Sequence, residues 1–149
     1  MNGEQWTGNR HRRRRGQPGH QVGARIAVMN DFPMFMKNAA NRIATANNAT
    51  SGVKGYVFDG ADGSQMAFWT CSQTASSSAH AHEFDEYMIV VQGCYTLVID
   101  GLHIPLNAGA EYLIPKGVLH SGEVLAGTRT IHAFGGHRAN RISATVAEN

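Results

Sequence analysis

The chain has 149 residues, of which 42% are hydrophobic, and this is enough for one domain with a buried core. Its seventeen glycines against four prolines indicate many tight turns, which suits a compact β-protein better than a helix bundle or a disordered chain. The sequence contains no apolar run of the roughly 20 residues that a bilayer-spanning helix needs. Its N-terminus also lacks an apolar signal segment, so we expect a cytoplasmic protein without a membrane partner.

The net charge of +2 is unevenly distributed. Residues 1–25 hold six arginines and a single acid and carry +5, whereas the rest of the chain carries −3. Because residues 1–28 are polar and have almost nothing apolar to bury, we predict a disordered, Arg-rich extension there and one folded domain over residues 29–149. The run of four arginines at residues 12–15 has no interleaved aromatic residues, and we do not expect nucleic acid as a partner.

The first part of the folded domain is ambiguous. Residues 31–48 carry four apolar anchors that fit either an entry strand or a short helix, namely Met34, Phe35, Met36 and Ile43. A turn at residues 60–63 precedes a short apolar strand at residues 66–71. The serine-rich stretch at residues 72–78 predicts a loop.

From residue 87 onward the pattern is that of short β-strands. Strands are predicted at residues 87–91, 95–99, 103–106, 111–114, 118–123 and 128–134. Glycine-containing turns separate them, and Asp100-Gly101 is the strongest hairpin signal, typical of a type I′ turn. Many short strands without helical periodicity predict an all-β antiparallel sandwich or barrel.

The two cysteines, Cys71 and Cys94, both lie in apolar β-like runs. A single pair in a chain of this length does not make a disulfide framework, and no C-x-x-C spacing indicates a metal or redox site. We therefore predict two buried free thiols.

A group of metal-ligand residue types lies at residues 80–86. Side chains alternate along an extended strand, so His80 and His82 project from one face, and Glu86 keeps the same parity. Two imidazoles and a carboxylate on one face suit a divalent transition metal. A fourth ligand must come from elsewhere, and His120 begins or occupies a new strand after a Pro- and Gly-containing turn.

The joint spacing of these residues resembles the two sequence motifs of the cupin superfamily. The first motif reads H-x-H-x-x-x-E-x-x-x-x-x-x-G from His80 to Gly93. The second reads G-x-x-x-x-x-P-x-G-x-x-H from Gly109 to His120. The resemblance covers about residues 66–134, and every metal-ligand position holds the expected residue type.

Two positions depart from the motifs. Thr74 stands where the first motif begins with glycine, and Val124 stands where the second ends with asparagine. Both lie outside the ligand set. The resemblance implies a double-stranded β-helix, a jelly-roll-like barrel with one metal ion near an open end. It also implies a homodimer formed by edge-strand pairing of the N-terminal segment.

Three imidazoles and one carboxylate leave two adjacent positions of an octahedral ion open. The ligand set suits Fe, Mn, Ni, Co or Zn. With iron, the resemblance implies dioxygenase chemistry on a small polar or carboxylated molecule, such as diketone cleavage or thiol oxidation, and we rank this first. A redox-inert ion would make a Lewis-acid isomerase or lyase, and a non-catalytic small-molecule-binding cupin is a third alternative.

The strand predicted at residues 128–134 offers two further candidates on opposite faces. If the His132 face points into the barrel, His132 is a general acid or base beside the metal. If the other face does, Arg129 binds a substrate carboxylate bidentately. Further apolar residues could line the substrate pocket or simply form the core, namely Met66, Phe68, Trp69, Met88 and Tyr112.

Overall fold

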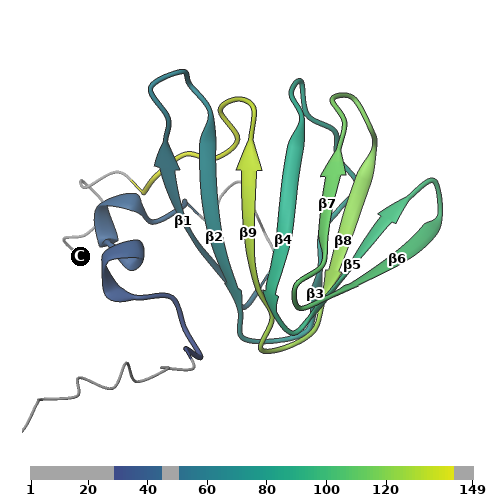
Figure 1. The fold of residues 1–149 in the computed structure, drawn as a ribbon, viewed down its shortest axis with the longest axis horizontal. Helices are drawn as coiled ribbons and strands as arrows, with labels where there is room; N and C mark the ends of the chain where they lie inside the picture. The colour runs from purple at the N-terminus through teal and green to yellow at the C-terminus, as the bar shows by residue number, and fades with distance from the viewer. Residues whose placement is uncertain (1–28, 45–50, 143–149) are drawn as a thin grey trace, which may run out of the picture.

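The computed structural model describes residues 29–44 and 51–142 of the chain. The predicted extension over residues 1–28 lies outside this part. The described chain begins with two 3-10 helices, η1 (Met34–Lys37) and η2 (Ala39–Asn41), which lie beside β1 (Figure 1). The strands that follow are β1 (Val53–Asp59), β2 (Gln65–Cys71), β3 (Ala75–Ser76), β4 (Glu86–Gln92), β5 (Cys94–Ile99), β6 (Leu102–Asn107), β7 (Glu111–Ile114), β8 (His120–Val124) and β9 (Arg129–Phe134). Neither described helix has the length and apolar character needed to cross a membrane.

The strands form two antiparallel sheets. One has the order β1-β2-β9-β4-β7, which Figure 1 shows side by side, and the other has the order β3-β8-β5-β6. From β4 onward the chain moves back and forth between the sheets, because β4, β7 and β9 belong to the first and β5, β6 and β8 to the second. This is the topology of a double-stranded β-helix, so the predicted all-β class and barrel are confirmed.

The core lies between the two sheets. Met88 and Val90 of β4 pack with Leu97 and Leu106 of the opposite sheet, and all four are buried. Burial alternates along β4, so Glu86 shares the inward face of Met88 and Val90. Strand periodicity therefore turns a carboxylate into the barrel at the start of β4.

Turn chemistry fixes the ends of β4 and β5. Asp100 and Gly101 have φ values of 51° and 76°, as a type I′ turn requires, so the predicted hairpin is confirmed. Gly93 has a φ of 81°, and a Cβ there would lie 2.8 Å from the backbone Cα of Thr128. The glycine that ends the first motif is thus the residue that allows β5 to pass close to the start of β9.

The N-terminal part differs from the prediction in several respects. Of the two alternatives for residues 31–48, the described part forms short helices, and residues 45–48 lie outside it. Ile43 is buried as expected, but Met34 and Phe35 are about three-quarters exposed, at 77% and 75%, and do not anchor the segment. Strand β1 was not predicted at all. Its central Gly55 lies directly against the Trp69 ring, and glycine weakens a strand signal in the sequence.

Two smaller predictions also need correction. The serine-rich stretch is not entirely a loop, because β3 within it pairs with Val124 and Glu123 of β8. Both cysteines are free, and Cys71 is buried as predicted, whereas Cys94 is only half-buried.

Candidate metal centre

Backbone hydrogen bonds bring two distant segments of the chain together around the histidines. His80 and His120 exchange two N–H···O bonds of 2.8 and 2.9 Å, and the Gly117 N–H donates to the His82 carbonyl at 2.9 Å. Residues 80–86 do not form the extended strand that the parity argument assumed, because the β-pairing of this segment is limited to an isolated bridge at His80. Its pairing with the turn before β8 nevertheless turns both imidazoles to the same side.

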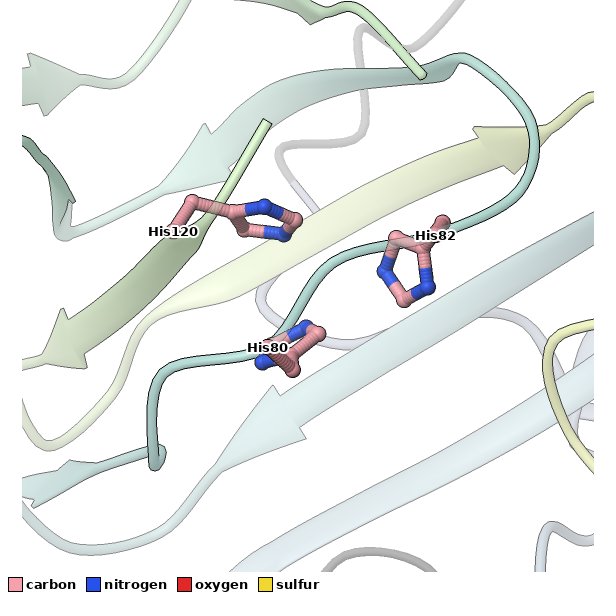
Figure 2. Close-up of side chains that lie close together, drawn as sticks. All are labelled: His80, His82 and His120. Carbon is pink, nitrogen blue, oxygen red and sulfur yellow. The ribbon is translucent and has the colours of Figure 1, made fainter. Parts of the chain in front are cut away.

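Three imidazoles converge at this point (Figure 2), and their candidate ligand atoms all lie within 4.8 Å of one another. Glu86 adds a carboxylate, because its Oε2 lies 3.0 Å from His82 Nε2 and 3.3 Å from His120 Nε2. The four residues that the sequence proposed as metal ligands therefore lie together at one end of the barrel.

The orientation of two imidazoles leaves one nitrogen of each ring available to a cation. His80 Nδ1 lies 2.9 Å from the Ser78 carbonyl oxygen, and His120 Nδ1 lies 2.8 Å from the Val118 carbonyl oxygen. A carbonyl only accepts, so Nδ1 donates in both rings and Nε2 keeps its lone pair. Burial lowers the pKa of His80, which favours the neutral ring that a metal needs.

Aromatic packing orients the third imidazole. The His82 ring stacks on Phe84, with centroids 5.2 Å apart and planes 3° from parallel, and meets the Phe134 ring edge-on at 5.9 Å. Gly136 makes room for this stack, because a Cβ there would lie 2.5 Å from Phe84 Cδ1. A residue with a side chain at position 136 would push Phe84, and with it His82, out of place.

Two atoms of the cluster test whether it fits a metal ion. Among the described residues, the buried side-chain nitrogen and oxygen atoms without a hydrogen-bond partner are His82 Nε2 and Glu86 Oε2. Leaving such an atom unpaired costs about 1–3 kcal/mol. Two ligand atoms at right angles, each about 2.1 Å from an ion, lie about 3 Å apart, close to the observed separation. A cation shared by the two atoms satisfies both, so the donor set fits a divalent transition metal.

Glu86 is held as an ionised group with one oxygen directed at the histidines. Burial by itself raises its pKa, but the imidazoles of His120, His132 and His82 around the carboxylate outweigh burial and place the pKa far below its ordinary value. The nearby Glu86 carboxylate helps to raise the pKa of His120 against the opposing effect of burial. His132 Nδ1 lies 2.6 Å from Glu86 Oε1, and His132 Nε2 lies 3.0 Å from Thr130 Oγ1. The carboxylate accepts from Nδ1, the Thr130 hydroxyl donates to Nε2, and Oε2 is left for the metal.

A cavity of about 100 Å³ adjoins the cluster. It reaches His80, Glu86 and His120 and is open to solvent. Its wall is largely aromatic and aliphatic, formed by Trp69, Tyr95, Val124 and Phe134. Trp69 thus occupies the place that the sequence proposed for it.

The other predicted pocket residues do not line this cavity. Met88 is fully buried in the core between the two sheets, and Tyr112 packs against that core. Met66 and Phe68 lie on the outer face of the five-stranded sheet, where Met66 is 45% exposed and Phe68 packs against Phe32 at 5.5 Å. These four residues belong to the core or to the outer surface.

Strand β9 turns its His132 face inward, as one of the two alternatives required. Arg129 lies on the opposite face, where it donates to Gln92 Oε1 at 3.1 Å and to the Met29 carbonyl at 2.9 Å. Its guanidinium also lies 5.0 Å above the Phe32 ring. Arg129 therefore fastens the N-terminal segment to the sheet, and the idea that it binds a substrate in the cavity is wrong.

The cavity residues that sequence reasoning missed include Tyr95 and Arg138. Tyr95 shares the inward parity of Leu97 on β5, and that alternation could have identified it. Arg138 follows the last strand in an irregular segment, where no periodicity predicts the direction of a side chain.

Comparison with solved structures identifies the fold. KdgF from Halomonas sp. matches with a TM-score of 0.54 at 19% identity, over 64% of this chain and 93% of that one. An RmlC-like cupin from Shewanella frigidimarina matches with a TM-score of 0.54 at 24% identity, over 58% of this chain and 78% of that one. The polyketide cyclase RemF from Streptomyces resistomycificus matches with a TM-score of 0.50 at 21% identity, over 64% and 75% of the two chains.

The double-stranded β-helix with a histidine cluster at one end is the cupin fold, and this chain has it. The resemblance inferred from the two motifs is confirmed at the level of the fold. No protein-family model matches the sequence, and no curated protein matches it either.

Proposed function

We propose that this protein is a metal-dependent enzyme that acts on a small polar or carboxylated molecule, with dioxygenase-type chemistry as the first candidate. The observation that carries the proposal is the pair of unpartnered buried atoms, His82 Nε2 and Glu86 Oε2, 3.0 Å apart beside the cavity. A site that served only the stability of the fold would have no reason to keep these atoms unpaired next to an opening.

The residues of the proposed site would have different roles. His80, His82, Glu86 and His120 would hold one divalent ion, and His132 would keep the Glu86 carboxylate in a single orientation. The aromatic wall of the cavity keeps water away from part of a bound molecule. A bound redox-active ion supplies dioxygen chemistry, whereas a redox-inert ion supplies Lewis-acid polarisation.

A Lewis-acid isomerase or lyase is the second candidate. It is favoured by the similarity to RemF, which is a polyketide cyclase. The same four ligands would serve either chemistry, and the identity of the metal distinguishes the two. A non-catalytic ligand-binding role remains the third candidate.

Metal binding is the first test. Metal-free protein would be loaded separately with Fe(II), Mn(II), Ni(II), Co(II) and Zn(II), and the bound metal would be measured by elemental analysis. We expect one equivalent per chain, and we expect His82→Ala to lose most of it. His103→Ala is the matched control, because His103 is 59% exposed and lies 3.7 Å from Glu123, away from the cluster. Retention of a full equivalent by His82→Ala would overturn the ligand assignment.

Oxygen consumption is the second test. The iron-loaded protein would be assayed in an oxygen electrode with small diketones and thiols, and the zinc-loaded protein would serve as the redox-inert control. Oxygen uptake that requires iron, a substrate and His82 supports the dioxygenase. Metal-bound protein that consumes no oxygen with any of these compounds removes the dioxygenase from first place.

A further inference from the structure

Besides the metal-binding residues, the polar residues that line the cavity include Ser76, Ser77, Thr130, His132, Tyr95 and Arg138. The last two bring the Tyr95 hydroxyl and the Arg138 guanidinium, a charged hydrogen-bond donor. We propose that these two groups bind the carboxylate of a small organic acid beside the metal centre. The inference names the substrate class of the proposed enzyme, and it rests on that proposed function only in taking the bound acid as substrate.

A rigid backbone places Arg138 at the cavity. The side-chain Oε1 of Gln65 accepts the backbone N–H of Arg138 at 2.6 Å and that of Ala139 at 2.8 Å. The Nε2 of Gln65 donates to the Ala139 carbonyl at 3.1 Å and to Asp59 at 2.8 Å. Gln65 is only 3% exposed, so this clamp is buried and holds the segment after β9 against the barrel. The position of Arg138 is thus set by the fold and does not depend on a mobile surface loop.

The charges around the cavity favour an anion. The Arg138 guanidinium has five N–H donors arranged in a fork, so it can bind a carboxylate in addition to the contacts it makes within the protein. Burial lowers its pKa, although an arginine remains charged. Among the described residues that line the cavity, Glu86 is the acidic one, and the double positive charge of a bound divalent ion exceeds its single negative charge. One carboxylate reduces this excess positive charge.

Tyr95 supplies a neutral donor on the same cavity. Burial and the nearby Glu86 raise its pKa, so its hydroxyl keeps its proton and can donate it. Gly122 of β8 gives the hydroxyl its place, because a Cβ at position 122 would lie 1.8 Å from the Tyr95 oxygen. The glycine therefore sets how deeply the phenol enters the cavity from β5.

The size and the wall of the cavity limit the rest of the ligand. A volume of about 100 Å³ is smaller than the roughly 150 Å³ of an engineered cavity that binds benzene. Trp69, Phe134 and Val124 offer apolar surface, which suits a short hydrocarbon body. The fitting ligand is a short-chain organic acid with its carboxylate at Arg138.

Trp69 provides a direct readout of binding, because it lines the cavity and the chain has only one other tryptophan, Trp6. In a Trp6→Phe background, the single indole N–H signal in a ¹⁵N-NMR spectrum reports the cavity. Sodium propionate and its uncharged analogue propionamide would be titrated into metal-free and zinc-loaded protein. We expect a saturable shift with propionate and at least tenfold weaker binding of propionamide.

Substitutions then assign the site. Arg138→Gln should weaken propionate binding at least tenfold, Arg138→Lys less, and Tyr95→Phe about three- to tenfold. Arg141→Gln is the matched control, because Arg141 lies on the same segment but pairs with Asp59 at 2.6 Å. Its affinity for propionate should equal that of the wild type.

The outcomes separate this proposal from the proposed function. Equal binding of propionate and propionamide, equal binding by wild type and Arg138→Gln, or no shift at all with either probe would overturn the anion site, even if zinc binds fully. Arg138-dependent propionate binding in a protein that takes up no metal would support the anion site and overturn the metal-dependent enzyme. The comparison of propionate with propionamide uses the unaltered cavity, so it decides the question even if Arg138→Gln does not fold.

Discussion

Replacing His132 with leucine is expected to weaken the binding of a divalent metal about ten- to a hundredfold. His132 Nδ1 lies 2.6 Å from Glu86 Oε1, and the two side chains are only 8% and 6% exposed. A hydrogen bond to a charged group contributes about 1.5–3 kcal/mol, and each 1.4 kcal/mol is a factor of ten in affinity. Leucine keeps the volume but removes the donor, so the carboxylate would lose the contact that directs Oε2 toward His82 and His120.

The assay is a competition titration of Co(II) between the protein and a chromophoric chelator, with the Co(II) absorption bands as a second readout of the ligand geometry. His132→Asn should keep much of the affinity, because its amide nitrogen can take the place of Nδ1. His103→Leu, a substitution of an exposed histidine away from the cluster, should bind Co(II) like the wild type. If His132→Leu binds Co(II) within twofold of the wild type and with the same spectrum, His132 does not position Glu86, and the general acid or base role predicted from the sequence regains priority.

Three further predictions concern the stability of the fold and the oligomeric state. Burial raises the pKa of Cys71 to about 11 from an ordinary value of 9.0, so the unfolded thiol ionises first, and stability should fall between about pH 9 and pH 11 in thermal melts. Cys71→Ala should reduce this loss of stability at high pH. If the stability of the variant depends on pH as that of the wild type does, the prediction is wrong. Gly93→Ala should destabilise the protein by about 2–4 kcal/mol in chemical denaturation, because the strain of a left-handed backbone adds to the steric clash with Thr128. Gly63→Ala should destabilise it by only about 1–2 kcal/mol, because Gly63 has a φ of 84° but open space around it. The homodimer stays a prediction: the N-terminal segment expected to form it exposes Phe35 at 75%, and Phe35→Glu should shift the mass measured by light scattering toward the monomer, while a monomeric wild type would refute the dimer.

The part of the fold that follows from local chemistry could be predicted from the sequence. The strand predicted at residues 111–114 coincides with β7, and those predicted at 87–91 and 128–134 match β4 and β9 to within one residue at each end. Alternation and glycine turns are properties of short segments, so one sequence is enough to read them. The approach of His80 to His120 was accessible only through the joint spacing of two motifs, because their 40-residue separation leaves no local signal.

The direction of side chains could be predicted only in part. Parity along β4 correctly turns Met88 inward together with Glu86, but parity does not say at which depth the barrel is filled and at which end it is hollow. On β9 both faces carry apolar residues, with Ile131 on one and Phe134 on the other, because a central strand is covered on both sides. The sequence therefore left His132 and Arg129 as equal alternatives until the packing of Phe32 against the outer face decided between them.

The segment after β9 shows why the rest of the site had no sequence signal. Its Gly135 N–H donates to the Asp85 carbonyl at 2.9 Å, and its Gly136 admits the Phe84 ring that orients His82. Two residues further on, Arg138 reaches the cavity. The segment has no periodicity, so its role depends on tertiary contacts with residues far earlier in the chain, Phe84 and Asp85 as well as Gln65. Because one segment supports both His82 and Arg138, the candidate metal centre and the proposed anion site would be parts of a single structural unit, and a ligand held at Arg138 would lie at a fixed position relative to a bound metal.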